Sequence, residues 1–284
     1  MAVEVERRFG TVTMYFKRLA QARFVDPGWL LVLGSAAVIW ALTVVKPEPF
    51  HGIFVFLSDG IMVTFRLTVT SFFFILVVGL AGGVGRIAKN PIVNGIASLY
   101  VEIMRGIPLM VQLLFIWFAL PQVLDYAGKA ILDGLPAMTS LGGWLIDLSM
   151  SPSAAAVLGL TLCYGAYMSE IYRAGIESIP KGQMEAARSL GMSYFQAMRY
   201  IILPQAIKVI LPPAGNEFVA LLKDSALVSV LAVSDLTRRG REYMARTFLS
   251  LETWAMVALI YLVLTLFFAR IVVFIEKKTG FEMT

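Results

Sequence analysis

The chain has 284 residues, 58% of them hydrophobic and only 15% charged, and its mean hydropathy is +0.78. Soluble proteins are usually about 45–50% apolar and about 25% charged, so this composition excludes an ordinary soluble domain and predicts an integral membrane protein. The net charge of +5 does not predict a nucleic-acid partner, because basic residues beside membrane spans usually record topology. Cys163 is the only cysteine, so no intrachain disulfide can form, and we expect it to be a small helix-packing residue.

Six segments contain the roughly 20 mostly apolar residues that a transmembrane helix needs. In chain order they are Trp29–Val45, Ile61–Val84, Ile96–Leu120, Ser153–Ile171, Ile201–Leu222 and Trp254–Ile275. The third, fourth and fifth are interrupted by charged residues, Pro or Gly, which indicates helices that face a pathway or a partner and not lipid. Pro204, Pro212 and Pro213 predict a bent fifth helix. The expected fold is therefore an all-α bundle of six transmembrane helices, with its function in the middle of the chain.

The positions of Lys and Arg predict the side of the membrane that each connection occupies. If the amino terminus is cytoplasmic, the inside segments hold most of the Lys and Arg residues, as the positive-inside rule requires. Residues 1–28 then form a cytoplasmic tail, and the carboxyl terminus is cytoplasmic as well. Outside, over Pro121–Pro152, four Gly residues indicate a loop with a short amphipathic element. We also expect a turn at His51 and a short surface helix within Ser234–Glu252. That helix is either simply solvated or a docking surface for a soluble partner.

A short polar segment, SIPKGQMEAARSLGMS (residues 178–193), separates the fourth and fifth apolar segments on the cytoplasmic side. Pro180 suits the first turn of a helix, and Gly191 suits the residue just past its end. Between them, Met184, Ala187 and Leu190 would share one face of a helix. Such a helix fits a partner's groove, although a helix lying on lipid headgroups would have the same pattern.

The same segment carries a family resemblance. EAARSLG (residues 185–191), followed by ILPQA (residues 202–206), resembles the EAA motif of permease subunits in binding-protein-dependent ABC importers. Three further stretches resemble the polar amino acid branch of that superfamily: VEIMRGIPLMVQLLFIWFALP (residues 101–121), GAYMSEIYRAGIESIPKGQ (residues 165–183) and NEFVALLKDSALVSVLAVSDL (residues 216–236). The four motifs occur in one order along most of residues 58–278.

The resemblance implies a five-helix type I ABC permease domain over residues 58–278. The chain departs from the compact members of the family by an extra helix, Trp29–Val45, which we expect to serve as an anchor or to pack laterally. It implies that residues 180–192 form the coupling helix, which docks on a separate ATPase. The residues expected to contact the ATPase are Lys181, Glu185, Ala186, Ala187, Leu190 and Gly191. Within this helix, Ala186 and Ala187 would allow close approach and Glu185 would offer a charge.

Partners follow from the same resemblance. The permease would work with two ABC ATPase subunits, a second copy of itself or a related permease, and an external solute-binding protein, in the inner membrane of a bacterium. The chain lacks G-x-x-x-x-G-K-[ST], the phosphate-binding loop of nucleotide hydrolases. ATP and Mg²⁺ are therefore expected to act in the partner ATPase, and this chain is expected to bind no cofactor and to catalyse no reaction.

Charged residues inside the predicted spans suggest a substrate pathway. An ionisable side chain at the bilayer centre costs about 2.5–3.5 kcal/mol on insertion scales, so it needs a partner or a water-filled cavity. Arg105 and Glu170 are at similar predicted depths, so we hypothesise that Arg105 holds the α-carboxylate of an amino acid and Glu170 its ammonium group. Alternatively, they form structural ion pairs with each other or with Glu102 and Arg173. Four residues at the outer end of the fifth span, Asn216, Glu217, Lys223 and Asp224, are expected to line or gate the entrance, with local helix capping as the alternative.

Two other classes of protein remain as alternatives. An ion-coupled secondary amino acid transporter would need its own ion site and no ATPase, whereas a membrane scaffold would explain neither the charges in the spans nor the cytoplasmic motif. No cluster of His, Cys or carboxylate residues has metal-ligand spacing, and no arrangement of a nucleophile and a base is visible. The predicted function is therefore inward transport of polar amino acids.

Overall fold

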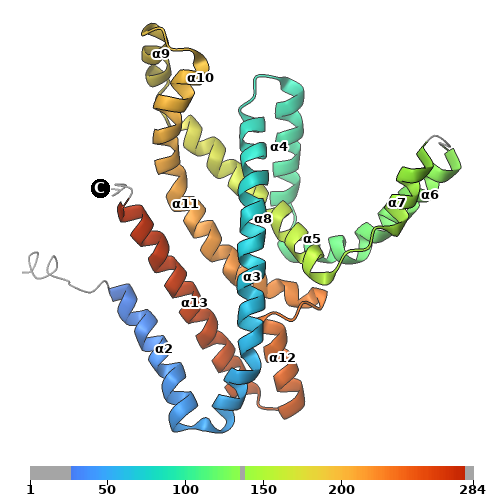
Figure 1. Cartoon of the computed structure of the whole chain (residues 1–284), viewed down its shortest axis with the longest axis vertical. Helices are drawn as coiled ribbons and strands as arrows, with labels where there is room; N and C mark the ends of the chain where they lie inside the picture. Colours follow the sequence, from blue (N-terminus) through green and yellow to red (C-terminus); the bar gives the residue numbers. More distant parts are fainter. Residues whose placement is uncertain (1–26, 135–137, 279–284) are drawn as a thin grey trace, which may run out of the picture.

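The computed structural model describes residues 27–134 and 138–278, and long helices dominate these ranges (Figure 1). Residues 1–26, which make up most of the predicted cytoplasmic tail, lie outside the described residues. The main helices in chain order are α2 (Pro27–Val45), α3 (Pro47–Arg86), α4 (Pro91–Gly106), α5 (Leu109–Leu114), α6 (Leu120–Gly134), α7 (Thr139–Asp147), α8 (Pro152–Glu177), α9 (Lys181–Ser189), α10 (Tyr194–Ala197), α11 (Leu203–Asp224), α12 (Leu236–Thr247) and α13 (Ser250–Lys278). Two π-helical turns, η1 (Phe115–Ala119) and η3 (Met198–Ile202), and one 3₁₀ helix, η4 (Ser225–Leu231), connect some of them.

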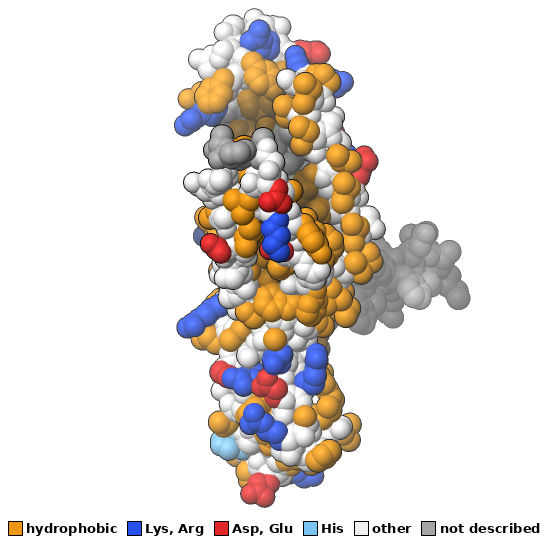
Figure 2. All heavy atoms as spheres, turned by 90° about the vertical axis from the view of Figure 1, so that its right-hand side faces the viewer, with side chains coloured by type: hydrophobic (Ala, Val, Ile, Leu, Met, Phe, Trp, Pro, Cys, Tyr) orange, Lys and Arg blue, Asp and Glu red, His pale blue; other side chains and the backbone are white. Residues whose placement is uncertain are grey.

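Five segments of the described chain are long and apolar enough to cross a membrane. They are Gly28–Val45, Pro47–Arg86, Leu109–Gly134, Pro152–Glu177 and Ser250–Lys278. The fifth predicted span corresponds to α11, which is not among these five segments, because its prolines and charged residues lower its hydropathy. Length and composition therefore do not confirm six transmembrane helices. Pro212 and Pro213 lie inside α11, which bends along its course in Figure 1. On the face shown in Figure 2, charged side chains of both signs cluster at the lower end, a mainly hydrophobic band lies above them, and further charged side chains of both signs lie between this band and the upper end.

The third predicted span, Ile96–Leu120, is not one helix. Pro108 restricts the residue before it to extended backbone, and Ile107 accordingly has φ −105° and ψ 132°. Helix α4 therefore ends at Gly106, and a new helix starts at Leu109. The interruption that the sequence predicted for this span is therefore a break into two helices at Pro108.

The loop expected over Pro121–Pro152 is also wrong, because α6 and α7 form a helical hairpin that projects to the side in Figure 1. Its helices pack closely at two glycines. A Cβ atom added to Gly128 would lie 2.6 Å from the carbonyl oxygen of Gly142, so neither position tolerates a side chain. Sequence inspection took these glycines as loop formers, whereas they permit helix contact.

Helix α3 runs the length of the molecule and holds two hydrophobic clusters together (Figure 1). Its carboxyl-terminal half packs on α8 through Gly79, Gly82 and Gly83, which lie against Met168, Ser169 and Tyr172. Its amino-terminal half packs on α12 and α13 around Leu57, Leu236 and Met256. His51 lies in the first turns of this helix and not in a turn between helices. The extra helix α2 packs on α13, for example through an edge contact between the rings of Trp29 and Phe267.

The short surface helix predicted within Ser234–Glu252 is confirmed as α12. Two of its four arginines form ion pairs: Arg238 and Arg239 both pair with Glu242, and Arg239 also pairs with Asp59 of α3. The carboxylate of Asp235 accepts hydrogen bonds from the backbone N–H groups of Thr237 and Arg238 and caps the helix. Asp235 is only 1% exposed.

The buried Asp235 predicts a pH-dependent stability. Burial raises its pKa from 3.8 to about 6, although its backbone hydrogen bonds oppose the shift. Between those values the folded state holds a proton that the unfolded state releases, so stability falls as pH rises from about 4 to about 6, by at most about 3 kcal/mol. We expect the thermal midpoint of the wild type to be higher at pH 5 than at pH 7.5, and this difference to shrink in Asp235→Asn, which keeps the cap acceptor. Equal pH dependence in both proteins would contradict this assignment.

Candidate functional site

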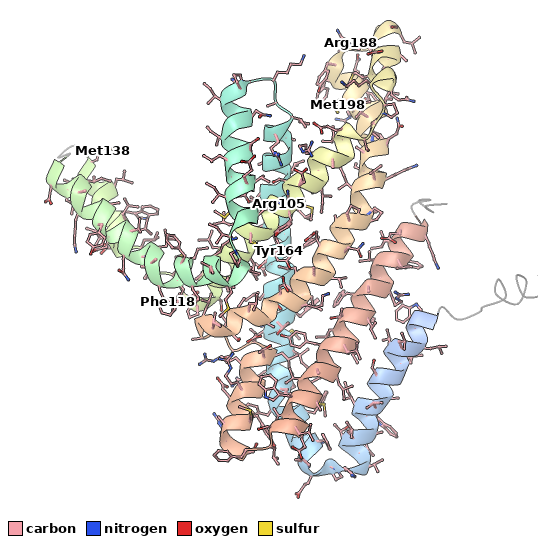
Figure 3. The ribbon with its side chains drawn as sticks, turned by 180° about the vertical axis from the view of Figure 1, so that it is seen from behind. Arg105, Phe118, Met138, Tyr164, Arg188 and Met198 are labelled. Atoms are coloured by element: carbon pink, nitrogen blue, oxygen red, sulfur yellow. The ribbon has the colours of Figure 1, made fainter. Side chains whose placement is uncertain are left out.

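The predicted coupling segment forms a separate helix at one end of the molecule. Helix α9 and the short α10 lie beyond the ends of α8 and α11, and Figure 3 shows Arg188 at this tip. Pro180 precedes the helix as its N-cap residue, one position before the predicted first turn. The tip is held to the rest of the molecule by contacts of α9 with α10 and η3.

Gly191 ends α9 as predicted. Its φ is +84°, in the left-handed region that favours glycine. The N–H of Gly191 donates to the carbonyl of Arg188 over 3.0 Å, and the N–H of Met192 donates to the carbonyl of Ala187 over 3.2 Å. These two bonds form a Schellman motif, so the end of the helix is fixed by the local sequence.

The predicted shared face of α9 needs a correction. Ala187 is buried within this chain, whereas Leu190 is 84% exposed because it is the C-cap residue, where the helical repeat ends. Leu190 is joined at the tip by the exposed side chains of Tyr194 and Phe195. We call Leu190, Tyr194 and Phe195 the tip patch. Tyr194 and Phe195 were not predicted as site residues. The only signal for them in the sequence is that two adjacent aromatic residues occur in a polar segment, just past the EAA motif.

A second candidate site lies where α4 is interrupted. The carbonyl groups that end α4 lack helical partners, and the side-chain amide of Gln112 donates to two of them, Met104 and Ile107, over 2.7 and 2.8 Å. The Tyr100 hydroxyl donates to the carbonyl of Leu162 over 2.8 Å and ties α4 to α8. The break is therefore supported on both sides, and it presents Arg105 in the middle of the molecule, next to Tyr164 (Figure 3).

The broken end of α4 borders a cavity of about 350 Å³, at the lower end of the usual size for small-molecule sites, about 300–1,000 Å³. Arg105, Tyr167, Tyr164, Glu217 and Asp224 supply its polar lining. The Arg105 guanidinium lies 5.3 Å from the centre of the Tyr167 ring, and the Tyr164 hydroxyl donates to Asp224 over 2.7 Å. We call this cavity the polar cavity. It offers one cationic group and two carboxylates to a ligand.

The predicted pathway residues lie in three places. Arg105, Glu217 and Asp224 line the polar cavity, whereas Asn216 and Lys223 are exposed on a neighbouring face of α11. Glu170 does not line the cavity, because its carboxylate pairs with Arg86 and Arg173. This geometry corresponds to the structural ion pair that the sequence left open as the alternative for Glu170.

Two polar lining residues were not among the predicted pathway residues: Tyr164 and Tyr167. Glu217 and Asp224, which were both predicted, are seven residues apart, which is two helical turns, so the spacing places both carboxylates on one face of α11. No group of His, Cys, Asp and Glu residues within 27–134 and 138–278 could hold a metal ion.

Comparison with known proteins gives the family. The model of the binding-protein-dependent transport system inner membrane component matches residues 75–280. The chain belongs to this family. The match begins inside α3, so it includes both candidate sites of the permease and leaves α2 outside.

Relatives of the permease cover most of its length. The glutamine transport system permease protein GlnP of Escherichia coli (strain K12) is 36% identical over 222 residues, 78% of this chain and 92% of GlnP. The arginine transport system permease protein ArtQ of Bacillus subtilis (strain 168) is 36% identical over 223 residues, again 78% of this chain and 92% of the relative.

Solved structures show the same fold. A crystal structure of an amino acid ABC transporter with histidines is 35% identical, covers 84% of this chain and 97% of its own, and gives a TM-score of 0.67. An inward-facing MetNI methionine ABC transporter, 21% identical over 81% of this chain and 99% of its own, has a TM-score of 0.63 and supports the fold alone.

Proposed function

We propose that this permease moves polar amino acids inward across the inner membrane of a bacterium, driven by ATPase subunits that dock on α9. The observation that carries the proposal is the polar cavity, in a chain that is 35–36% identical to amino acid transporters. A free amino acid has a carboxylate and an ammonium group, and the cavity supplies a complement to each.

The proposed binding mode assigns one role to each charged group. Arg105 holds the α-carboxylate, because a planar guanidinium binds two carboxylate oxygens at once. Glu217 holds the ammonium group, in place of Glu170, whose carboxylate is engaged by Arg86 and Arg173. Asp224, oriented by Tyr164, is left to face the substrate's side chain. The surplus carboxylate favours a neutral or basic amino acid over an acidic one.

The proposed mechanism uses the two sites together. Closure of two ATPase subunits would pull the α9 helices of two permease copies, or of this permease and a related one, towards each other. The movement would pass through α8 and α11, which join α9 and α10 to the polar cavity, and would turn the cavity towards an external solute-binding protein. ATP and Mg²⁺ would be bound by the ATPase, and this chain would contribute binding and movement only. The proposed orientation places both termini and α9 in the cytoplasm.

Reconstituted uptake tests this function. Proteoliposomes that contain the permease, its co-purified ATPase and its binding protein should accumulate a radiolabelled neutral or basic amino acid only with ATP and Mg²⁺ on the ATPase side. An ATPase inactivated in its phosphate-binding loop is the control. Uptake driven by an ion gradient alone would support the ion-coupled secondary transporter and overturn our proposal.

A further inference from the structure

A second cavity lies apart from both candidate sites, between α3 and α8. Its volume is about 780 Å³, and its walls are mostly apolar. Six α3 residues from Val63 to Val78 line one wall, and six α8 residues from Ser153 to Leu162 line the other. The two helices run in the same direction, because Gly79 lies against Met168 and Gly83 against Tyr172. At 1.5 Å per residue, the α3 wall of this groove is about 22 Å long and the α8 wall about 14 Å.

One end of this groove is positively charged. Arg66 lines it and makes no ion pair or hydrogen bond within the part of the chain that the structure describes. Side chains on a helix lean towards its amino terminus, so the Arg66 guanidinium points to the end at which α8 also begins. Ser153 and Ala154, in the first turn of α8, line the groove there and add the positive end of a helix dipole.

A polar group deeper in the groove also lacks a partner. Thr161 is only 6% exposed, and its hydroxyl forms no hydrogen bond among the described residues. A buried hydroxyl without a partner is costly. Thr161 lies about 12 Å beyond Ser153 along α8, at 1.5 Å per residue, between the charged end and the apolar far end. The groove therefore presents a cationic end, one hydrogen-bond donor and an apolar channel, in that order.

We propose that this groove binds an anionic phospholipid, with its phosphate at Arg66 and the first turn of α8 and one acyl chain along Phe74 and Val78. A membrane leaflet is half of a hydrocarbon core of about 30 Å, so an α3 wall of about 22 Å is long enough for an acyl chain of one leaflet. The groove is separate from the polar cavity, so lipid binding is distinct from substrate recognition; the proposed orientation places the headgroup in the outer leaflet.

Native mass spectrometry of the permease–ATPase complex tests the proposal. Complexes are mixed with phosphatidylglycerol or with phosphatidylcholine of the same acyl chains, and the retained lipid is counted. The wild type and Arg66→Lys should retain phosphatidylglycerol in preference to phosphatidylcholine, and Arg66→Gln should lose at least about a factor of five of this preference, as expected for loss of a charge pair worth about 1 kcal/mol. Arg246→Gln, at an exposed arginine of α12, is the matched control and should behave as the wild type.

A second measurement leaves Arg66 intact. A photoreactive p-benzoylphenylalanine at Phe74, in the groove, should give a phospholipid adduct in membranes. A crosslinked permease pair instead of a lipid adduct would show that a second copy covers the groove and would overturn the proposal. Equal retention of the two lipids by the wild type, or an unchanged preference in Arg66→Gln, would overturn it as well.

Discussion

Glu185→Lys is expected to lower ATP-driven uptake by about tenfold or more while the permease still folds and inserts. Glu185 is exposed on α9 and forms no ion pair or hydrogen bond within the described residues, so its replacement removes nothing from the permease itself. At a docked interface, however, a reversed charge typically costs more than 1.4 kcal/mol, which is a factor of ten. Uptake and ATPase activity in proteoliposomes, together with co-purification of the ATPase, measure the effect.

Two variants separate docking from folding in this experiment. Asp133→Lys makes the same type of charge reversal at an exposed acid of the α6–α7 hairpin and should leave uptake unchanged. Gly191→Val places a β-branched residue at φ +84°, at a cost of about 1–2 kcal/mol, and should impair coupling by distorting the end of α9. Full ATP-coupled uptake by both Glu185→Lys and Gly191→Val would refute the coupling role of this helix.

Arg105→Ala is expected to raise the KM for substrate about 100-fold, because removal of one partner from a hydrogen-bonded charge pair costs about 2–5 kcal/mol. Glu217→Gln should weaken uptake of the same amino acid by removing the group that faces the ammonium. Arg105 is exposed to the cavity and its contact in the chain is the Tyr167 ring, so assembly should be preserved in both variants. Radiolabelled uptake over a range of substrate concentrations, and the yield of assembled complex, are the two measurements.

Neighbouring charges provide the controls for the polar cavity. Lys223→Ala changes an exposed residue next to Asp224 that does not line the cavity, and its KM should match the wild type. Glu170→Ala breaks the pairs with Arg86 and Arg173, so it should reduce stability or assembly more than substrate affinity. If Arg105→Ala retained the wild-type KM, or if Glu170→Ala were selectively defective in KM, the proposed binding mode would be wrong.

Local sequence was sufficient for features whose cause is local. The apolar segments identified the membrane helices at both ends of the chain, because burial in lipid depends on composition over about 20 residues. Pro180 and Gly191 located α9, because proline and glycine act on the backbone at their own positions. The EAA motif and its companions also indicated the family before any fold was known.

Features that depend on which helices meet were decided by the tertiary structure. Gly128 and Gly142 read as loop residues until α6 and α7 were seen to pack through them. Glu170 and Arg105 have similar predicted depths, yet the arrangement of α3 and α8 gives Glu170 to Arg86, and the break at Pro108 turns Arg105 towards Glu217 and Asp224. Depth along a helix follows from residue number, but the partner of a charge depends on the rotation and crossing of neighbouring helices, which one chain segment alone does not specify.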